Sequence, residues 1–536
     1  MSATVLDNIR NHASDRMQSN GNNDADTETT AETAMVVPEL LRNRALLLFG
    51  LALTAVASFL LLDRFLTSEL LTLGAGCAVA AAGVYLAIAK QQAVYMLLIA
   101  ALPLEATFVV EAGFSITPYY VLFGLLILSY VVHGKHVSLA ETPSRLLITY
   151  FAICTVSLVV GLFTAPPEVH ASSAMAWRAS AMRPLIQWIL TAVHILFFVV
   201  VLNRIRSRDD ILSSVKLYLW IGLGLGLIGC WQTLAVALDL PGKDFTHAFG
   251  AAADQGYQYG KTRFYSAFIA DFAPRATFRE SLHLSHYLVS FLPLAIGIVL
   301  YRKQLPESWR IRTPLILVVI SLATLLLTMS RSGWIAFAGA MAFMFCFCSK
   351  ARMLKAAAAT IAVIAVAGLA LKSLGYFRFD LDIWELMQLR MDVEKLGADP
   401  RVLYLQTLWA TFVQYPLLGV GIGNYGLFGA ARLGMDVVLS AHSVFLNALV
   451  ETGIIGFAVL CSVIVHFFWS AIGTIRKSRT LAAFPMLVGV CAGVFGMTIQ
   501  YCTFGDRPGF HYLFMIALGY AMIRFIRQNP LPSTVK

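Results

Sequence analysis

A short polar segment, Ser330-Arg331-Ser332-Gly333, lies where one apolar run ends and the next begins. An arginine at a membrane boundary is costly unless it has a partner or a wet cavity. The two serines beside Arg331 could hydrogen-bond an anion or cap the following helix. The alternative is that Arg331 extends along the helix to reach lipid phosphate. The segment alone therefore indicates an anion site or a lipid contact.

A second arginine follows a helix-start signal. Asp399 suits the N-cap of a helix and Pro400 its first position, so the sequence predicts Arg401 in the first turn. Unsatisfied N–H groups and the helix dipole favour an anion there, and a guanidinium matches the geometry of phosphate. The amphipathic run that follows is also compatible with an ordinary interfacial helix that leaves Arg401 in solvent.

The segment Ala441-His442-Ser443 precedes an apolar run that contains Asn447 and Glu451. These last two residues are four apart and would share a helix face. A carboxylate about two turns into an apolar span indicates a functional site by default, although helix–helix hydrogen bonding is the alternative. His442 has an intrinsic pKa near 6.5, which suits a general base.

Arg275, Arg279 and Glu280 end a long polar stretch, followed by His283 and His286. The spacing from Glu280 to His286 drifts around a helix, and the sequence has no H-E-x-x-H motif. We therefore expect no metal site. The two arginines remain candidates for sugar or phosphate contacts, and Glu280 is grouped with them.

Residues 421–426 match the pattern G-x-G-x-x-G. No βαβ pattern surrounds them, so we reject dinucleotide binding. Glycines here are more plausibly needed where backbone approaches backbone or a ligand. We expect no cofactor.

The elements that must position these residues are predicted to be membrane helices. The chain has 536 residues, is 58% hydrophobic and is only 13% charged, whereas a soluble domain has about 25% charged residues. About fourteen runs approach the roughly 20 residues that span a bilayer. They lie at 45–63, 70–89, 93–110, 116–133, 146–164, 184–202, 211–239, 284–301, 313–329, 333–349, 354–371, 442–470, 483–500 and 509–525. We predict an all-α integral membrane protein with about 12–14 transmembrane helices, the lower number allowing for re-entrant segments.

Charge placement predicts the orientation. Most Lys and Arg residues gather in alternate short connections, which marks those connections as cytoplasmic. The net charge of +10 therefore does not indicate nucleic-acid binding. Both termini are expected in the cytoplasm, with residues 1–43 as a disordered tail and 44–527 as the membrane domain. Two long loops, 240–283 and 372–441, would lie outside and contain short helices. Both carry basic residues against the usual bias, which favours either anion binding or surface salt bridges.

Taken in order, the motifs resemble those of the O-antigen ligase and Wzy-type polymerase superfamily of bacterial membrane glycosyltransferases. The likeness covers about residues 275–460 and rests on Ser330–Trp334, on Arg401 followed by Trp409 and Pro416–Tyr425, and on His442–Asn447 with Glu451–Gly453. It implies a GT-C type fold in the inner membrane and a glycan donor on undecaprenyl diphosphate, already on the periplasmic side. It further implies that Arg331 and Arg401 bind the diphosphate, that His442 acts at the acceptor, and that no metal takes part.

On this basis the predicted catalytic residues are His442, Arg331 and Arg401, acting in one displacement with inversion. The predicted substrate-binding residues are Arg275, Arg279, Glu280, Ser330, Ser332, Asn447 and Glu451. The preferred function is polymerisation of lipid-linked repeat units of an exopolysaccharide or O-antigen. An O-antigen ligase acting on lipid A core is one alternative, and a polysaccharide transporter or flippase is another. A purely structural scaffold gives no reason for basic outer loops. Other polysaccharide-assembly proteins are candidate partners.

Overall fold

The computed structural model describes residues 81–104, 110–111, 115–163, 182–238, 273–278, 280–303, 305, 314–373, 400–433, 441–477, 484–505 and 507–529. The predicted tail 1–43, the predicted span 45–63, Arg279 and most of both long loops lie outside these residues. The described residues form two compact units. One consists of residues up to Tyr95 with Val121–His136, and the other of Met96–Tyr120 with Val137 onwards.

The first unit contains the first helix of a bent pair and the beginning of the second, up to Tyr95. The helix Ala81–Ala89 meets α5 (Gln91–Ala101) at an angle of 119°. In the same unit lies most of α6 (Pro118–Val132), and Lys135 Nζ donates a hydrogen bond to Gln91 Oε1 at 2.6 Å. We expected a continuous span over 93–110, and this was wrong. The helix ends at Ala101 because the backbone before Pro103 is disfavoured in the α conformation.

The chain beyond that helix includes the only described strands. Two-residue strands β1 (Val110–Glu111) and β2 (Ser115–Ile116) pair antiparallel, with Val110 opposite Ile116. This small hairpin was not predicted. All other regular elements of the described structure are helices, which confirms the all-α fold class.

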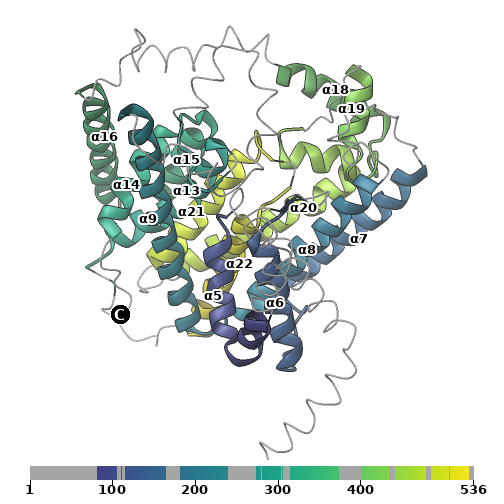
Figure 1. The fold of residues 1–536 in the computed structure, drawn as a ribbon, viewed down its shortest axis with the longest axis horizontal. Helices are drawn as coiled ribbons and strands as arrows, with labels where there is room; N and C mark the ends of the chain where they lie inside the picture. Colours follow the sequence, from purple (N-terminus) through teal and green to yellow (C-terminus); the bar gives the residue numbers. More distant parts are fainter. Residues whose placement is uncertain are drawn as a thin grey trace, which may run out of the picture. The chain divides into compact units, whose positions relative to one another are not determined.

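The second unit contains the helices on which the candidate site is built (Figure 1). They are α7 (Thr142–Phe163), α8 (Met182–Arg204), α9 (Arg208–Leu238), α13 (Ser281–Leu300), α14 (Pro314–Leu327), α15 (Arg331–Phe347), α16 (Lys350–Ser373), α18 (Pro400–Gln414), α19 (Tyr425–Leu433), α20 (Val444–Lys477), α21 (Phe484–Gln500) and α22 (Phe510–Gln528). Helices α18 and α19 fall within the second long loop, so the expectation of short helices there is confirmed.

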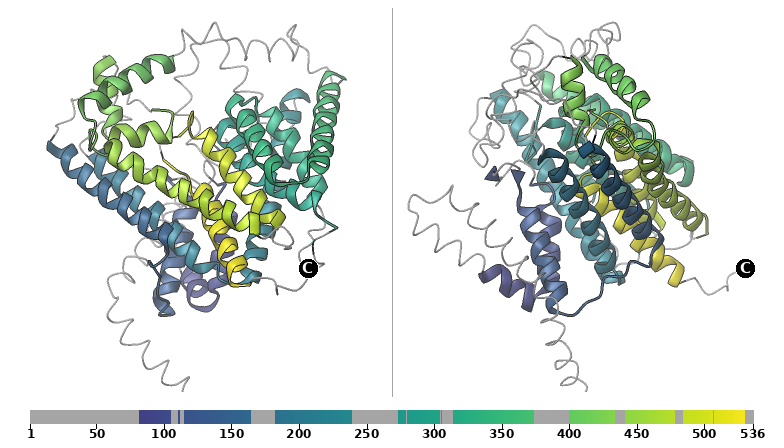
Figure 2. Two further views of the ribbon diagram at one scale, coloured as in Figure 1. Left: turned by 180° about the vertical axis from the view of Figure 1, so that it is seen from behind. Right: turned by 90° about the vertical axis from the view of Figure 1, so that its right-hand side faces the viewer.

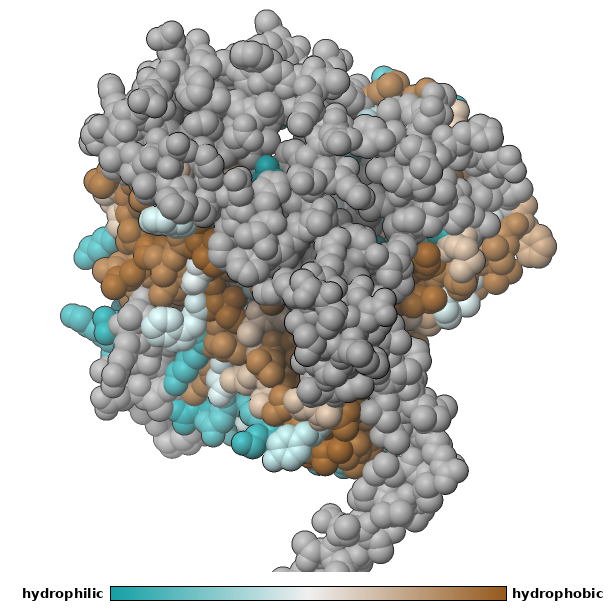
Figure 3. All heavy atoms as spheres, in the orientation of Figure 1, coloured by the Kyte–Doolittle hydropathy of each residue, from teal (hydrophilic) through white to brown (hydrophobic). Residues whose placement is uncertain are grey.

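Several of these helices have the length and apolar character of membrane spans. Among the residues described, six helices pass this test, and the bent pair would add a seventh if it is one span. Large apolar side chains such as Phe163, Val465 and Trp469 are 85%, 64% and 80% exposed. Figure 3 shows that apolar side chains predominate on the described part of one face. Such a surface fits a lipid environment and not water.

Helix α13 lies at the centre of the second unit. Every residue from Leu284 to Ile298 is buried, which is typical of a helix enclosed by other helices. It packs against α21, α15, α14 and α9 (Figure 1, Figure 2). Glycines make the contact with α21 close: a Cβ on Gly493 would lie 2.1 Å from the Ser290 carbonyl oxygen. Small residues at helix crossings are a usual device in membranes.

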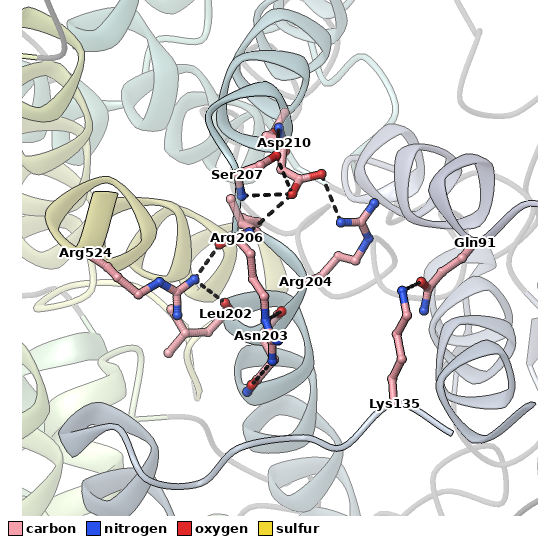
Figure 4. Close-up of polar contacts among 11 residues, drawn as sticks. Gln91, Lys135, Leu202, Asn203, Arg204, Arg206, Ser207, Asp210 and Arg524 are labelled. Carbon is pink, nitrogen blue, oxygen red and sulfur yellow. Dashed lines mark hydrogen bonds and ion pairs between the residues drawn. The ribbon is translucent and has the colours of Figure 1, made fainter. Parts of the chain in front are cut away.

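One end of α8 is held by an arginine from α22. Arg524 Nη2 donates to the carbonyl oxygens of Ile205 at 2.5 Å and Leu202 at 3.2 Å (Figure 4). Its Nη1 contacts the Glu141 carboxylate. The last carbonyl groups of a helix have no partner within the helix, and a cation there also complements the helix dipole. Arg524 therefore joins the ends of two helices through groups that would otherwise be unsatisfied.

The replacement Arg524→Ala should lower the free energy of unfolding of the purified protein by about 1–3 kcal/mol, because the carbonyl groups and Glu141 lose their donor. Thermal unfolding in nanodiscs would measure the effect. The matched control is Arg476→Ala, since Arg476 is exposed at the end of α20. Equal melting temperatures for the two variants would contradict this account.

Candidate functional site

The predicted helix cap before Arg331 is present. Helix α14 ends at Leu327, and Ser330 is the N-cap of α15, its hydroxyl accepting a hydrogen bond from the Gly333 N–H at 3.2 Å. The turn is tight, because Met329 adopts a φ of 51°. This conformation is uncommon for residues other than glycine. Arg331 is thus the first residue of α15, where the helix end favours an anion, and its side chain is half-buried.

Both serines beside Arg331 form part of a buried polar network. Ser285 Oγ of α13 donates to Ser330 Oγ at 3.0 Å. Gln500 Nε2 of α21 donates to Ser285 Oγ at 3.0 Å and to Ser332 Oγ at 3.4 Å. In this structure the serines therefore link three helix ends and fix the backbone of Arg331. Their predicted role in binding substrate stays a prediction.

Gln500 is a site residue that the sequence reasoning missed. It is fully buried at the end of α21, and its Oε1 atom has no hydrogen-bond partner within the described structure. A lone glutamine after a long apolar run was the available signal. Its importance depends on neighbours more than 150 residues away, which no local pattern reveals.

Helix α18 begins at Pro400, as predicted, and so places Arg401 in its first turn. The Arg401 side chain and Asp399 lie outside the description. The helix is anchored by Leu408, which is 2% exposed and joins a core cluster with Val420, Tyr425, Ala441 and Val450. The backbone of Arg401 is therefore attached to the same cluster as the start of α20.

His442 lies just before α20 in an unusual backbone conformation. Its φ is 47°, a region that costs a non-glycine residue energy. The side chain is exposed, and its ring stacks on Tyr404 with 6.2 Å between centroids. Tyr404 is one helical turn after Arg401, so His442 faces the first part of α18. The structure thus brings two of the three predicted catalytic segments together.

A hydrogen bond also relates His442 to the α15 end. The Val444 N–H donates to the Tyr501 carbonyl oxygen at 3.1 Å. Tyr501 follows Gln500, which contacts Ser332. The C-terminal end of α21 is thus bonded to Ser332, the neighbour of Arg331, and to Val444, two residues after His442. Figure 2 allows the surrounding helices to be followed from two sides.

The glycine-rich loop before α19 forms backbone hydrogen bonds with α20 where that helix is interrupted. Gly453 has a φ of 66° inside that helix. The N–H of Ile454 donates to the Pro416 carbonyl oxygen at 2.9 Å, and the N–H of Val420 donates to the Val450 carbonyl oxygen at 2.9 Å. Backbone groups within a membrane must be satisfied inside the protein. The loop therefore supplies the hydrogen bonds that the broken helix cannot make.

The spacing of the glycines follows from these close approaches. A Cβ on Gly419 would lie 2.4 Å from the Glu451 carbonyl carbon, and one on Gly421 would lie 2.4 Å from Gly161 Cα in α7. Arg183 Nε of α8 donates to the Gly423 carbonyl oxygen at 2.7 Å. Each glycine thus meets protein backbone or is held by it, and the expectation that backbone approaches backbone here is confirmed.

Gly419→Ala should destabilise the protein by about 2–4 kcal/mol, because the methyl group meets the α20 backbone and φ is positive. The φ of Gly419 is 71°. Gly473→Ala in α20 is the matched control, since a Cβ there meets nothing within 4 Å and alanine favours helix by about 1 kcal/mol. Thermal unfolding of both variants distinguishes packing from a general effect of losing glycine. A Gly419→Ala variant as stable as Gly473→Ala would refute this.

Asn447 and Glu451 line one cavity, which confirms that they share a helix face. Glu451 is only 7% exposed, and its carbonyl oxygen accepts from Ser157 Oγ at 2.6 Å. Arg507, between α21 and α22, lines the same cavity and was not predicted. It lies in a connection expected outside, where a basic residue runs against the usual bias. We applied that signal to the two long outer loops and to the shorter one that holds Arg178 and Arg183, but not to this connection.

The histidines of α13 contact protein groups. His286 Nδ1 lies 2.6 Å from His511 Nε2 of α22. In the part of the chain that is described, no group of three or more His, Cys, Asp or Glu side chains is arranged to hold a metal ion.

The predicted residues before α13 lie in a tight turn. The Arg275 N–H donates to Gln232 Oε1 of α9 at 3.0 Å, and Ala276 has a φ of 50°. Glu280 is exposed at the N-cap position of α13 and makes no side-chain cap bond. Since α13 carries Ser285, this turn is connected to the Arg331 end through the Ser285–Ser330 contact.

Comparison with known proteins gives one result. Residues 316–461 match the family model described as O-antigen ligase. The match runs from α14 into α20 and includes Arg331, Arg401, His442 and Glu451, whereas Arg507 lies outside it. No curated protein sequence matches the chain.

Proposed function

We propose that this chain, a multi-pass bacterial membrane protein whose residues 316–461 form an O-antigen ligase domain of the Wzy type, transfers a glycan from undecaprenyl diphosphate to an acceptor hydroxyl at the periplasmic face of the inner membrane. The family match supports glycosyl transfer of the ligase or polymerase kind in general, and lipid-linked glycans as substrates. One structural observation carries the finer proposal. The helix starts at or just before which Arg331, Arg401 and His442 lie are connected to one another by hydrogen bonds or by packing.

The arrangement suits departure of a diphosphate. Arg331 begins α15 and Arg401 is in the first turn of α18. Each arginine thus belongs to a helix end that favours an anion, and a guanidinium group would add positive charge there. Charge that develops on the diphosphate as the bond to the sugar breaks would be stabilised there, and such preorganised donors typically contribute most to catalysis.

His442 would act on the acceptor. Its exposed ring takes the proton from an acceptor hydroxyl while that oxygen forms a bond to the anomeric carbon. The anomeric carbon–phosphate oxygen bond breaks in the same step, and undecaprenyl diphosphate leaves with the electron pair. One displacement inverts the anomeric configuration. Among acceptors, we favour a second lipid-linked glycan, which makes the protein a polymerase; lipid A core as acceptor would make it a ligase.

Purified protein in nanodiscs should convert undecaprenyl-diphosphate oligosaccharide alone into a ladder of longer lipid-linked products, with a chelator present. Product that appears only after lipid A core is added would identify a ligase. Arg331→Ala and His442→Ala should each lower the rate by about 10²–10³-fold, because a charge-stabilising group or a base is lost. Arg432→Ala, exposed at the end of α19, is the control. Rates in both site variants equal to that of the control would exclude this mechanism.

The proposed sidedness can be tested separately in a Cys346→Ser, Cys502→Ser background, since these two cysteines are exposed. A cysteine at position 432 should react with a membrane-impermeant maleimide from the periplasm, and one at position 476 only after the membrane is opened. The expectation follows from the placement of basic loops. Labelling in the opposite order would reverse the orientation, and labelling that changes with ligand at position 432 would favour a transporter.

A further inference from the structure

A cavity with mainly apolar walls and a few polar groups lies beside the first turns of α20, within the second unit. It measures about 60 Å³ and is enclosed by α7, α8, α20 and the connection that leads into α22. By the usual allowance of about 10–15 Å³ per water-sized probe, the space takes a single sugar ring and not an oligosaccharide. Its size therefore limits the ligand to one small polar unit.

The walls carry hydrogen-bonding groups of several kinds. Gln187 and Asn447 contribute amides, Thr191 a hydroxyl, Glu451 a carboxylate and Arg507 a guanidinium. Planar amide, carboxylate and guanidinium groups can each bond two neighbouring hydroxyl groups of a sugar. The formal charges of Glu451 and Arg507 cancel, and Glu451 would repel a diphosphate. A neutral ligand rich in hydroxyl groups fits these walls better than an anion.

Arg507 is the residue that most needs a ligand. Its Nη1 atom is buried and has no hydrogen-bond partner within the residues that the structure describes. A buried donor on a charged group that is left without an acceptor costs several kcal/mol. The loop that carries Arg507 is fixed in place, because the Gly509 N–H donates to Tyr501 Oη at 2.7 Å. A ligand oxygen in the cavity would satisfy the group.

The cavity extends to within two residues, along the chain, of the residue proposed as base. Val444 lines it and is two residues after His442. The Val444 N–H is bonded to the Tyr501 carbonyl oxygen, and Tyr501 begins the connection that contains Arg507. Ile422, from the glycine-rich loop, forms part of another wall. A sugar ring held here would have its neighbouring ring near His442.

We propose that this cavity is a sugar-binding subsite, which holds one ring of the acceptor glycan through Arg507, Asn447 and Gln187. The inference deepens the proposed function and rests on it for the identity of the ligand as acceptor. The subsite positions the acceptor, while Arg331 and Arg401 hold the donor.

With free oligosaccharide supplied as an acceptor that cannot act as donor, kinetics separate the two substrates. Arg507→Lys should raise the KM for acceptor about tenfold, the effect of losing roughly 1.4 kcal/mol, and should leave the donor KM and kcat within about twofold. Ala448→Leu tests the same space without touching a polar group, because Ala448 lines the cavity and is 5% exposed. Arg432→Ala should change neither constant. An unchanged acceptor KM in both cavity variants, with normal transfer, would overturn the subsite and leave the proposed function standing.

Direct binding gives a readout that does not need transfer. Free oligosaccharide, released by mild acid from the host's surface polysaccharide or its lipid A core in separate samples, should raise the melting temperature of wild-type protein in nanodiscs. It should protect Arg507→Lys and Ala448→Leu less, and pyrophosphate should protect all three equally. Protection by oligosaccharide without transfer would refute the proposed function but not the subsite. Equal protection of all variants, or protection by pyrophosphate that depends on Arg507, would refute the subsite.

Discussion

The requirement that backbone polar groups find partners inside a membrane protein governs the site. Helix α20 is interrupted at Gly453, which frees carbonyl and N–H groups in an apolar environment. The loop from Pro416 to Gly423 fills this gap with its own backbone, and only glycines allow the approach. This one arrangement holds α7, α8 and α20 together and turns Glu451 into the cavity. The same loop therefore packs against α18, is hydrogen-bonded to α20 and contributes to the cavity wall.

Local sequence signals predicted much of the fold. Most of the expected runs within the described residues correspond to helices, and Ser330 and Pro400 begin helices where their types predict it. These predictions succeeded because apolar length and helix-start chemistry are properties of neighbouring residues. The bend after Ala89 falls between two predicted runs, but its angle of 119° and the hairpin at Val110 were not predicted, because apolar length says nothing about the angle between helices or about strand pairing.

The site could be predicted only in part. His442 was identified from its place before an apolar run and from the family resemblance. Asn447 and Glu451 were identified from their spacing on one helix, and the structure places these two on one cavity. Gln500 and Arg507 were missed because their meaning lies in contacts between distant segments. Gln500 is a site residue because it bonds to Ser285 and Ser332. Arg507 is one because it lines a cavity whose other walls come from α7 and α8. A single polar residue near an apolar run has no periodicity that would reveal such contacts.

The two proposed phosphate-binding arginines are supported in different ways. The backbone of Arg331 is fixed by buried hydrogen bonds between three helices. Arg401 is carried by α18, where Leu405, Trp409 and Val413 are 47%, 60% and 59% exposed. An amphipathic helix with an exposed aromatic residue lies naturally among lipid headgroups. We therefore expect the position of α18 along the membrane normal to follow the thickness of the bilayer. The distance between the two arginines, and with it the affinity for the carrier lipid, would then depend on the acyl-chain composition of the surrounding membrane.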